Sequence, residues 1–189
     1  MLVFFAVAAL ASPPVVQAEI ATEPLAPGGP GPFWFTCTER MAVVASSTLK
    51  GEVSYEVGNL IDRDLLTAWV EGVDGPGIGQ WVDVTLKETV PPGDAPWFRS
   101  TFLVANGYVN TEALWKKNAR VKTMTVLVGE QELATVHLLD SRTVQWFHLP
   151  EIPGLRQHDV TVRFRIDSVY PGTKHEDTCL SQLVPRCLN

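Results

Sequence analysis

The feature that most constrains the fold is a series of short segments in which hydrophobic and polar residues alternate. The clearest runs over residues 160–169 (VTVRFRIDSV), where Val160, Val162, Phe164 and Ile166 occupy every second position. Alternation with a period of two places one set of side chains on each face of a β-strand. The segment is therefore predicted to be a strand with one buried face.

Seven further segments are apolar or alternate in the same way. They span residues 41–45, 80–86, 98–105, 123–128, 133–138, 143–149 and 180–184. Turn-forming residues separate the three segments between 123 and 149, which are predicted to form a meander. Only 60–68 and 111–119 have weak helical character. About eight strands without helical crossovers predict an all-β fold, an antiparallel sandwich or jelly roll.

The composition suits one such domain. A chain of 189 residues with 46% hydrophobic residues can bury a sizeable core, to which six tryptophans and eight phenylalanines contribute. The formal charge is −6 and the basic residues are scattered. Because phosphate backbones are bound through clustered positive charge, no nucleic-acid partner is predicted.

The N-terminus is typical of an exported protein. An apolar run (MLVFFAVAAL) is followed by ASPPVVQA, so residues 1–18 are predicted to be a signal peptide with Val16 and Ala18 at the positions that a signal peptidase reads. No basic residue precedes the run. No later segment suits a transmembrane helix, and a secreted or periplasmic protein is expected.

Residues 19–36 form a Pro/Gly-rich linker or arm whose end, 33–35, is expected to dock on the domain at 37–189.

Three cysteines allow three single pairings. Cys37 opens the folded part and Cys187 nearly ends the chain, which favours a bridge between them. Such a bridge closes a long loop and would contribute roughly 4 kcal/mol in the chain-entropy model. Cys179–Cys187 is the local alternative.

The stretch 55–72 (YEVGNLIDRDLLTAWVEG) places polar groups between apolar ones. It is either a ligand or metal site, or a turn whose side chains bond their own backbone. It is no EF-hand loop, because Leu66 and Val73 occupy ligand positions. Hard oxygens of Asp62, Asp64 and Thr67 leave a structural calcium site of another kind open. The histidines have no partner at zinc-ligand spacing.

No motif for a nucleophile, metalloprotease or nucleotide-binding loop occurs, so no enzymatic activity is predicted. Three polar segments lie between strands, at 106–108, 115–120 and 170–178. Aromatic rings with amide and charged neighbours suit sugars, which present a C–H face and hydroxyl groups. Trp69, Trp81 and Trp146 are predicted to pack in the core, whereas Tyr108, Trp115 and Tyr170 suit either role.

Together these motifs resemble a known family. The order of SSTL, NLIDRDLLTAWVEG, GIGQWVDV, NGYVNTEALWKKNARVK and VYPGTKHEDTCLSQL is similar to the NADase-type glycan-binding domain, a bacterial branch of the discoidin or coagulation factor type C, galactose-binding-like fold. The resemblance covers about 45–184. It implies a jelly-roll β-sandwich whose loops bind carbohydrate. The chain has no room for the catalytic NADase domain that accompanies this module in some toxins.

The resemblance also implies particular site residues. Discoidin-like relatives hold a structural calcium at the loop matching 59–67, and a glutamate on the last strand closes the site. In this sequence Gln182 stands in place of that glutamate, and Arg63 in place of a glycine. Both departures weaken a calcium site built from Asp62, Asp64, Thr67 and Gln182. Thr67 and Trp69 are expected to be scaffold and Glu71 to reach outward toward ligand. The recognition residues carried over are Glu71, Asn106, Tyr108, Asn118, Arg120, Tyr170, Lys174 and Asp177. Asn118 and Arg120 could equally tie one loop to another.

Two functions follow as hypotheses. The first is a secreted, non-catalytic carbohydrate-binding module that binds a glycan or polysaccharide through loops at one end of the sandwich. The second is a structural or protein-interaction domain of the bacterial envelope without glycan binding, which uses the same loops or the 33–35 arm on an envelope protein.

Overall fold

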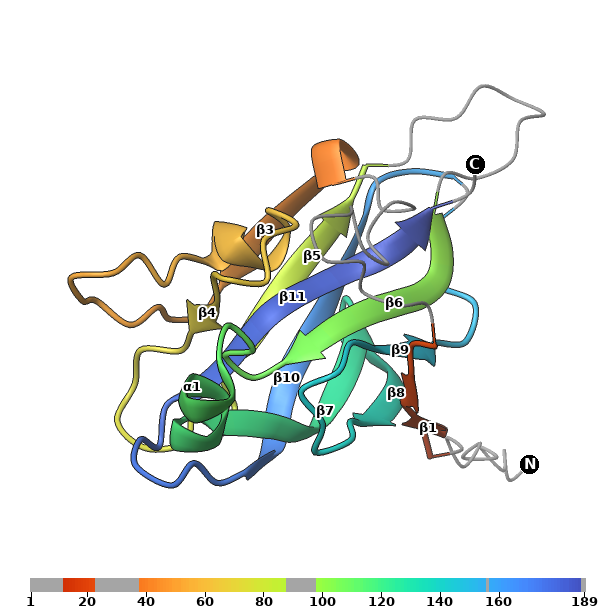
Figure 1. Cartoon of the computed structure of the whole chain (residues 1–189). Helices are drawn as coiled ribbons and strands as arrows, with labels where there is room; N and C mark the ends of the chain where they lie inside the picture. The colour runs from red at the N-terminus through yellow and green to blue at the C-terminus, as the bar shows by residue number, and fades with distance from the viewer. Residues whose placement is uncertain (1–11, 23–37, 88–97, 156, 188–189) are drawn as a thin grey trace, which may run out of the picture.

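The computed structural model describes residues 12–22, 38–87, 98–155 and 157–187. Nearly every regular element in these ranges is a strand (Figure 1). The strands are β1 (Val15–Gln17), β2 (Glu19–Ile20), β3 (Met41–Ala45), β4 (Trp69–Val70), β5 (Trp81–Leu86), β6 (Phe98–Asn106), β7 (Ala119–Val128), β8 (Gln131–His137), β9 (Gln145–His148), β10 (Val160–Tyr170) and β11 (Thr178–Cys187). The helical elements are the 3₁₀ turns η2 (Thr38–Arg40) and η3 (Val57–Leu60) and the helix α1 (Glu112–Lys117).

The strands form the two layers of an antiparallel sandwich. One layer follows the order β8–β7–β10–β5–β3, and the other contains β9, β6 and β11. The layers join where the first residues of β11 run parallel to β7, with Thr178 beside Ala119 and Cys179 beside Arg120. The start of β11 also pairs with the short β4. Strand β11 therefore connects the loop end of the molecule to its core.

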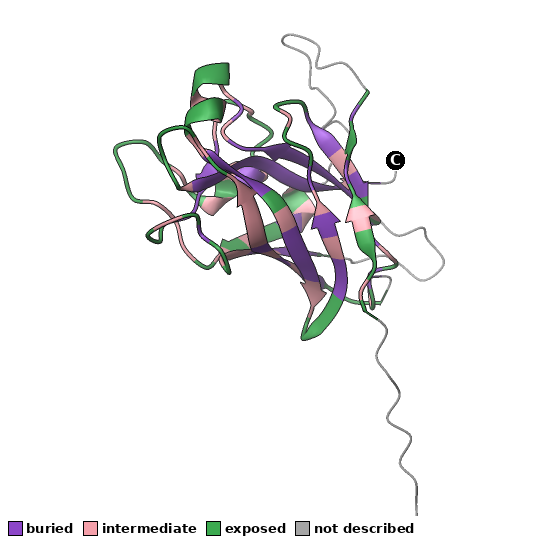
Figure 2. Ribbon diagram, turned by 90° about the horizontal axis from the view of Figure 1, so that it is seen from below, coloured by how far each residue is buried: buried purple, intermediate pink, exposed green. Residues whose placement is uncertain are grey.

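The core lies between the layers, and aromatic rings cross it. Phe102 of β6 lies 5.0 Å from Phe164 of β10, and Phe147 of β9 lies 6.3 Å from Phe164, as centroid distances. Burial alternates along β5 and along the first half of β10. This is the pattern that strict alternation predicts for strands with one solvent-facing side. Figure 2 shows that buried residues lie mostly in the strands and exposed residues mostly in the loops.

All eight predicted strands are present as β3 and β5 to β11. The predicted meander is wrong in its third strand, because β9 pairs with β6 of the other layer and not with β8. Of the two helical segments, 111–119 contains α1, but 60–68 contains only the end of η3 followed by bends and turns. None of the helices in the described ranges has the length and apolar character needed to cross a membrane.

The N-terminal segment lies against one edge of the sandwich. Strand β1 runs parallel to β8, and β2 pairs with β9. Between them, the Ala18 amide donates to the carbonyl of His137 at 2.9 Å, and Ala18 is 4% exposed. The segment that includes the predicted cleavage position thus completes the sheet. Removal of residues 1–18 as a signal peptide stays a prediction, and both 1–11 and the proposed docking trio at 33–35 lie outside the described residues.

Among the cysteines, Cys179 is a buried free thiol, so the Cys179–Cys187 pairing is wrong. Burial raises the pKa of this thiol far above its ordinary range. Cys37 lies outside the described residues, and its bridge to Cys187 stays a prediction.

Candidate functional site

The loops after α1 and after β10 are held together at one end of the sandwich. The amides of Thr173, Lys174 and His175 donate to the carbonyls of Lys116 and Lys117 at 2.8–3.1 Å. Gly172 permits this approach, because a Cβ there would lie 2.4 Å from the carbonyl oxygens of Lys117 and His175. The 171–177 loop is therefore fixed against the end of α1 by its backbone.

Helix α1 itself is short and capped. Thr111 accepts a bond from the Leu114 amide through its hydroxyl, and the Asn118 side-chain amide donates to the Leu114 carbonyl at 2.8 Å. Gly107, at φ +93°, lets the preceding chain turn close under the helix, because a Cβ there would lie 2.7 Å from the Trp115 ring. These contacts place Tyr108 and Asn118 at the same opening.

A pocket of about 140 Å³, called here the tyrosine pocket, opens between these loops. It is lined by Leu49, Tyr55, Val70, Tyr108, Leu114, Asn118, His175 and Asp177. The rings of Tyr55 and Tyr108 stand at 90° with centroids 6.4 Å apart, so one presents its edge to the other. Partial burial, followed by the nearby Tyr55 and Cys179, raises the pKa of the Tyr108 hydroxyl, which stays protonated and able to donate.

A second, wider hollow of about 400 Å³ adjoins the first through His175. It is lined mainly by the 169–176 segment, with Pro76 and Ala119 on its other side. Lys174, which is exposed, lies on this hollow and not in the tyrosine pocket. The two hollows share His175 in their linings.

Three of the predicted recognition residues line the tyrosine pocket: Tyr108, Asn118 and Asp177. Tyr170 does not line either hollow. Its hydroxyl donates to the Leu138 carbonyl at 3.0 Å, and the Lys122 ammonium lies 5.8 Å from its ring centre. Tyr170 therefore fastens β10 to the end of β8.

The structure buries Asn106 and Arg120. Asn106 bonds both backbone groups of Val121, donating to its carbonyl at 2.8 Å and accepting from its amide at 3.0 Å. Arg120 donates to both carboxylate oxygens of Asp140 and lies 4.4 Å over the Trp115 ring. Trp115 in turn donates to the Asn106 carbonyl at 2.9 Å. These polar residues act as a scaffold beneath the loops, which is the alternative that the sequence left open for Arg120.

The expectation that Glu71 reaches outward is wrong, since its side chain is fully buried. The carboxylate accepts bonds from the amides of Val73 at 2.8 Å and Thr178 at 3.4 Å. Gly77 at φ +66° passes so close that a Cβ would lie 2.6 Å from Glu71. Burial raises the pKa of Glu71, and the two amide bonds oppose that rise. Glu71 fixes the start of β11 to the loop after β4.

Sequence reasoning missed two pocket residues. Tyr55 opens the stretch that was singled out for its acidic groups, yet its ring was not considered for recognition. His175 lies in the polar segment 170–178, but by itself it was considered only as a zinc ligand. The available signal was the position of both residues in polar loops that flank predicted strands, where binding residues concentrate.

The match to a family model decides what kind of domain this is. Residues 34–184 match the model described as the NAD glycohydrolase translocation F5/8 type C domain. The chain belongs to this family. Comparison with curated protein sequences finds no match.

Solved structures show a similar fold. The CBM32-1 and CBM32-2 domains of Clostridium perfringens ZmpB, in complex with GalNAc, superpose with a TM-score of 0.63 at 11% identity over 95% of this chain and 41% of that chain. The mycobacterial arabinofuranosyltransferase AftD gives a TM-score of 0.50 at 17% identity over 76% of this chain and 10% of that chain. This F5/8 type C domain thus spans less than half the length of either structure.

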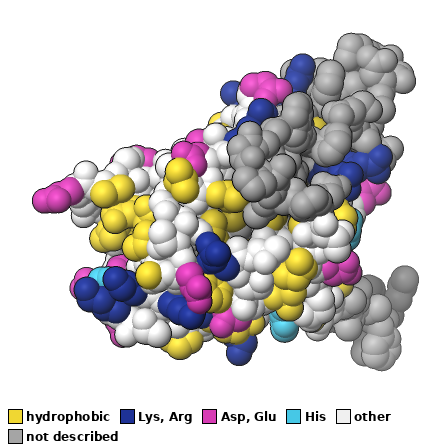
Figure 3. Space-filling view, viewed as in Figure 1, with side chains coloured by type: hydrophobic (Ala, Val, Ile, Leu, Met, Phe, Trp, Pro, Cys, Tyr) yellow, Lys and Arg dark blue, Asp and Glu magenta, His cyan; other side chains and the backbone are white. Residues whose placement is uncertain are grey.

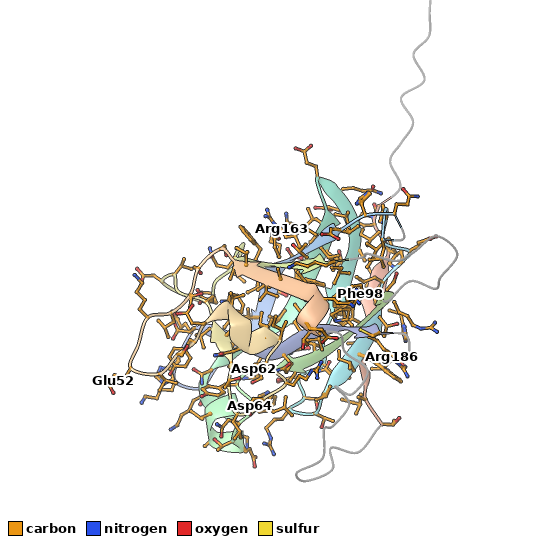
Figure 4. All side chains as sticks on the ribbon, turned by 90° about the horizontal axis from the view of Figure 1, so that it is seen from above. Glu52, Asp62, Asp64, Phe98, Arg163 and Arg186 are labelled. Carbon is orange, nitrogen blue, oxygen red and sulfur yellow. The ribbon has the colours of Figure 1, made fainter. Side chains whose placement is uncertain are left out.

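The predicted metal residues of this F5/8 type C domain do come together. Asp62 accepts bonds from the Thr67 hydroxyl at 2.7 Å and from the Gln182 side-chain amide at 2.8 Å, and Figure 4 shows Asp62 and Asp64 beside η3. They do not fit a cation, because the Gln182 nitrogen, a donor, faces the loop oxygens. No group of three or more acidic, histidine or cysteine side chains suited to a metal occurs within the described ranges.

The three tryptophans expected in the core differ in how far they are buried. Trp69 is fully buried and donates to the Ser47 carbonyl, as expected. Trp146 is half-buried and packs on the core. Trp81 instead lies on the outer face of β5, where the Arg163 guanidinium stacks 3.8 Å from its ring centre while bonding Asp83.

Proposed function

We propose that this domain binds a glycan, without catalysing a reaction, in the pocket between Tyr55 and Tyr108, as an exported module. The observation that supports it is the pair of tyrosine rings in a pocket whose polar lining is Asn118, His175 and Asp177. A ring can pack against the C–H face of a sugar, while amide, imidazole and carboxylate groups bond its hydroxyls.

The rigidity of the pocket also favours binding. Asn118 is held by its bond to Leu114, and His175 by its backbone bond to Lys117. Directly behind the pocket, the Asp177 carbonyl accepts from the Ala119 amide at 3.1 Å. Since the Asn118 side chain and the backbone at His175 and Asp177 are already ordered, a ligand loses little free energy in fixing them.

The size of the pocket suits a small contact. About 140 Å³ is below the roughly 300–1,000 Å³ typical of sites that enclose a drug-sized ligand. A glycan would therefore insert one sugar unit and extend over the adjoining hollow at His175, where Lys174 is exposed. The GalNAc bound to the similar clostridial domains supports a sugar as the ligand class.

A glycan array followed by calorimetric titration tests the proposal. Tyr108→Ala is expected to weaken binding about tenfold or more, which corresponds to about 1.4 kcal/mol. Tyr170→Phe is the matched control, since Tyr170 lies outside both hollows. Absence of binding to any glycan by folded protein would overturn the proposal.

The second candidate, a protein-interaction domain of the envelope, has one observation in its favour. On the face in Figure 3, hydrophobic side chains gather over β4, and the nearby loops expose Val53 (54%) and Leu66 (61%). Such patches can mark protein contacts. Substituting Ser for Val53 and Leu66 separates the two. If the second function holds, the variant loses a protein partner and neither the variant nor the wild type binds a sugar; if the first function holds, the variant keeps sugar binding.

A further inference from the structure

We propose that the side-chain amide of Gln182 takes the place of a bound cation in the loop from Asn59 to Thr67. The domain then folds independently of calcium, and the single change Gln182→Glu converts the loop into a calcium-dependent one. This inference does not depend on the proposed glycan site.

The first observation is the convergence of oxygens on one nitrogen. Gln182 Nε2 donates to the Asn59 carbonyl at 3.1 Å and to Asp62 Oδ1 at 2.8 Å, and the Asp64 carbonyl lies at 3.5 Å. Backbone carbonyls and a carboxylate directed at one point form the oxygen set that a hard cation prefers. Here the point holds an N–H donor.

The donor is held firmly in that position. Gln182 is fully buried in β11, opposite Ala105 of β6, whereas Asp62 and Asp64 lie on the exposed outer side of the loop. The side chain reaches outward from a core strand and closes the loop from beneath. Because β11 is fixed by β6, the amide is available without binding anything from solution.

Gln182 Oε1 is buried and has no hydrogen-bond partner within the described ranges. Reversing the amide would place this oxygen against the Asp62 carboxylate and two carbonyls, an arrangement that only a cation could stabilise. The bonds formed by Nε2 compensate for the unpartnered oxygen without any cation.

Charge in the loop also disfavours a dication. The Asp64 carboxylate accepts from the Leu66 amide at 2.8 Å and so caps the loop locally. Asp62 Oδ1 additionally accepts from the Asp64 amide at 2.8 Å. Arg63, which adopts φ 65° between the two aspartates in sequence, directs its guanidinium to Glu39 at 3.3 Å. A site with so few uncommitted negative charges binds calcium weakly.

A carboxylate in place of the Gln182 amide would reverse this balance. In the Gln182→Glu variant, the new side chain would direct an acceptor at the three oxygens that now receive the amide, and the repulsion would loosen the loop until a cation entered. Calcium could then bind the Asp62 carboxylate, the new carboxylate at position 182, the Asn59 and Asp64 carbonyls, and water. This set is within its usual coordination number. The substitution keeps the length of the side chain and changes only its donor.

Thermal melting with calcium chloride or with a chelator tests the proposal. The wild-type melting temperature is expected to be the same in both. Gln182→Glu is expected to melt several degrees lower in chelator and to recover with calcium, since a ligand that binds only the native state stabilises it. Gln182→Leu, which has neither donor nor acceptor, should be destabilised and insensitive to calcium.

Two outcomes overturn the inference. One is a calcium-dependent rise in the melting temperature of the wild type, or calcium binding by the wild type in calorimetry. The other is a Gln182→Glu protein whose melting temperature is the same with calcium and with chelator, or that is unfolded in both. Calorimetric titration of Gln182→Glu with calcium checks binding separately from stability.

Discussion

Two sets of polar side chains lie at the loop end of the sandwich, and they differ in how far they are buried. Asn106, Arg120 and Glu71 are buried and bond backbone or partner groups of the protein itself. Asn118, His175 and Asp177 line a pocket beside two tyrosine rings. Residue type is similar in the two sets, so burial, rather than chemistry, separates scaffold from candidate site. Mutations should therefore affect stability in the first set and binding in the second.

The largest effect is expected from Asn106→Leu. The change leaves the amide and carbonyl of Val121 without their side-chain partner in a buried position, which costs about 3 kcal/mol of unfolding free energy. Chemical denaturation measures the loss. Glycan affinity of the fraction that remains folded should be unchanged, and a selective loss of affinity would place Asn106 in the site.

The next effect is a loss of affinity with stability retained. Tyr55→Ala removes one ring from the half-exposed tyrosine pair, and glycan binding should weaken about tenfold, or about 1.4 kcal/mol. Tyr55→Phe keeps the ring and should keep most of the affinity. Equal losses of affinity and of unfolding free energy in Tyr55→Ala would assign Tyr55 to the scaffold instead.

The sequence predicts which face of a strand is buried, but not which strands pair. A period of two fixes which side of a strand is buried, and β3, β5 and β10 follow it. It does not say which strand pairs with which, so β9 was placed beside β8 instead of β6. Strands β1, β2 and β4, each of two or three residues, have too few positions to show any period.

The site was predicted in part for a related reason. Tyr108, Asn118 and Asp177 were found through their loops, and the structure brings them to one pocket. Glu71 and Asn106 come from similar polar contexts but point inward, because Glu71 precedes Gly72 at the end of β4 and Asn106 ends β6 against β7. The direction of a side chain at a strand end depends on the partner strand, which the local sequence does not contain.

A smaller effect concerns the thiol beneath the pocket. Cys179 is fully buried next to Glu71 and Asp177, and the resulting rise in its pKa keeps it protonated. It should not react with a thiol reagent in the native protein at neutral pH and should react at once in denaturant. Rapid native reaction would mean that the start of β11 opens, and that the scaffold is less rigid than the bonds at Thr178 indicate.

The smallest effect is a pH dependence from Glu71. Its pKa in the folded state lies above the ordinary value of 4.5, because burial outweighs the amide bonds from Val73 and Thr178. The folded state therefore binds the proton more tightly than the unfolded state does, and this contribution to stability is complete below pH 4.5 and is lost as the pH rises through the folded-state pKa. Denaturation curves across this range should show a slight decline assignable to Glu71.

Glu71→Gln is the matched variant. It should remove that decline while it keeps one acceptor for the two amides, so its stability should be lower but less dependent on pH over the same interval. Glycan binding by the folded variant should follow the wild type, because the Glu71 side chain lines neither hollow. The pH profile of glycan binding could instead change while the pH profile of stability does not. That outcome would move Glu71 from the scaffold to the site. It would break the distinction between buried scaffold and pocket-lining residues at the residue where burial is most complete.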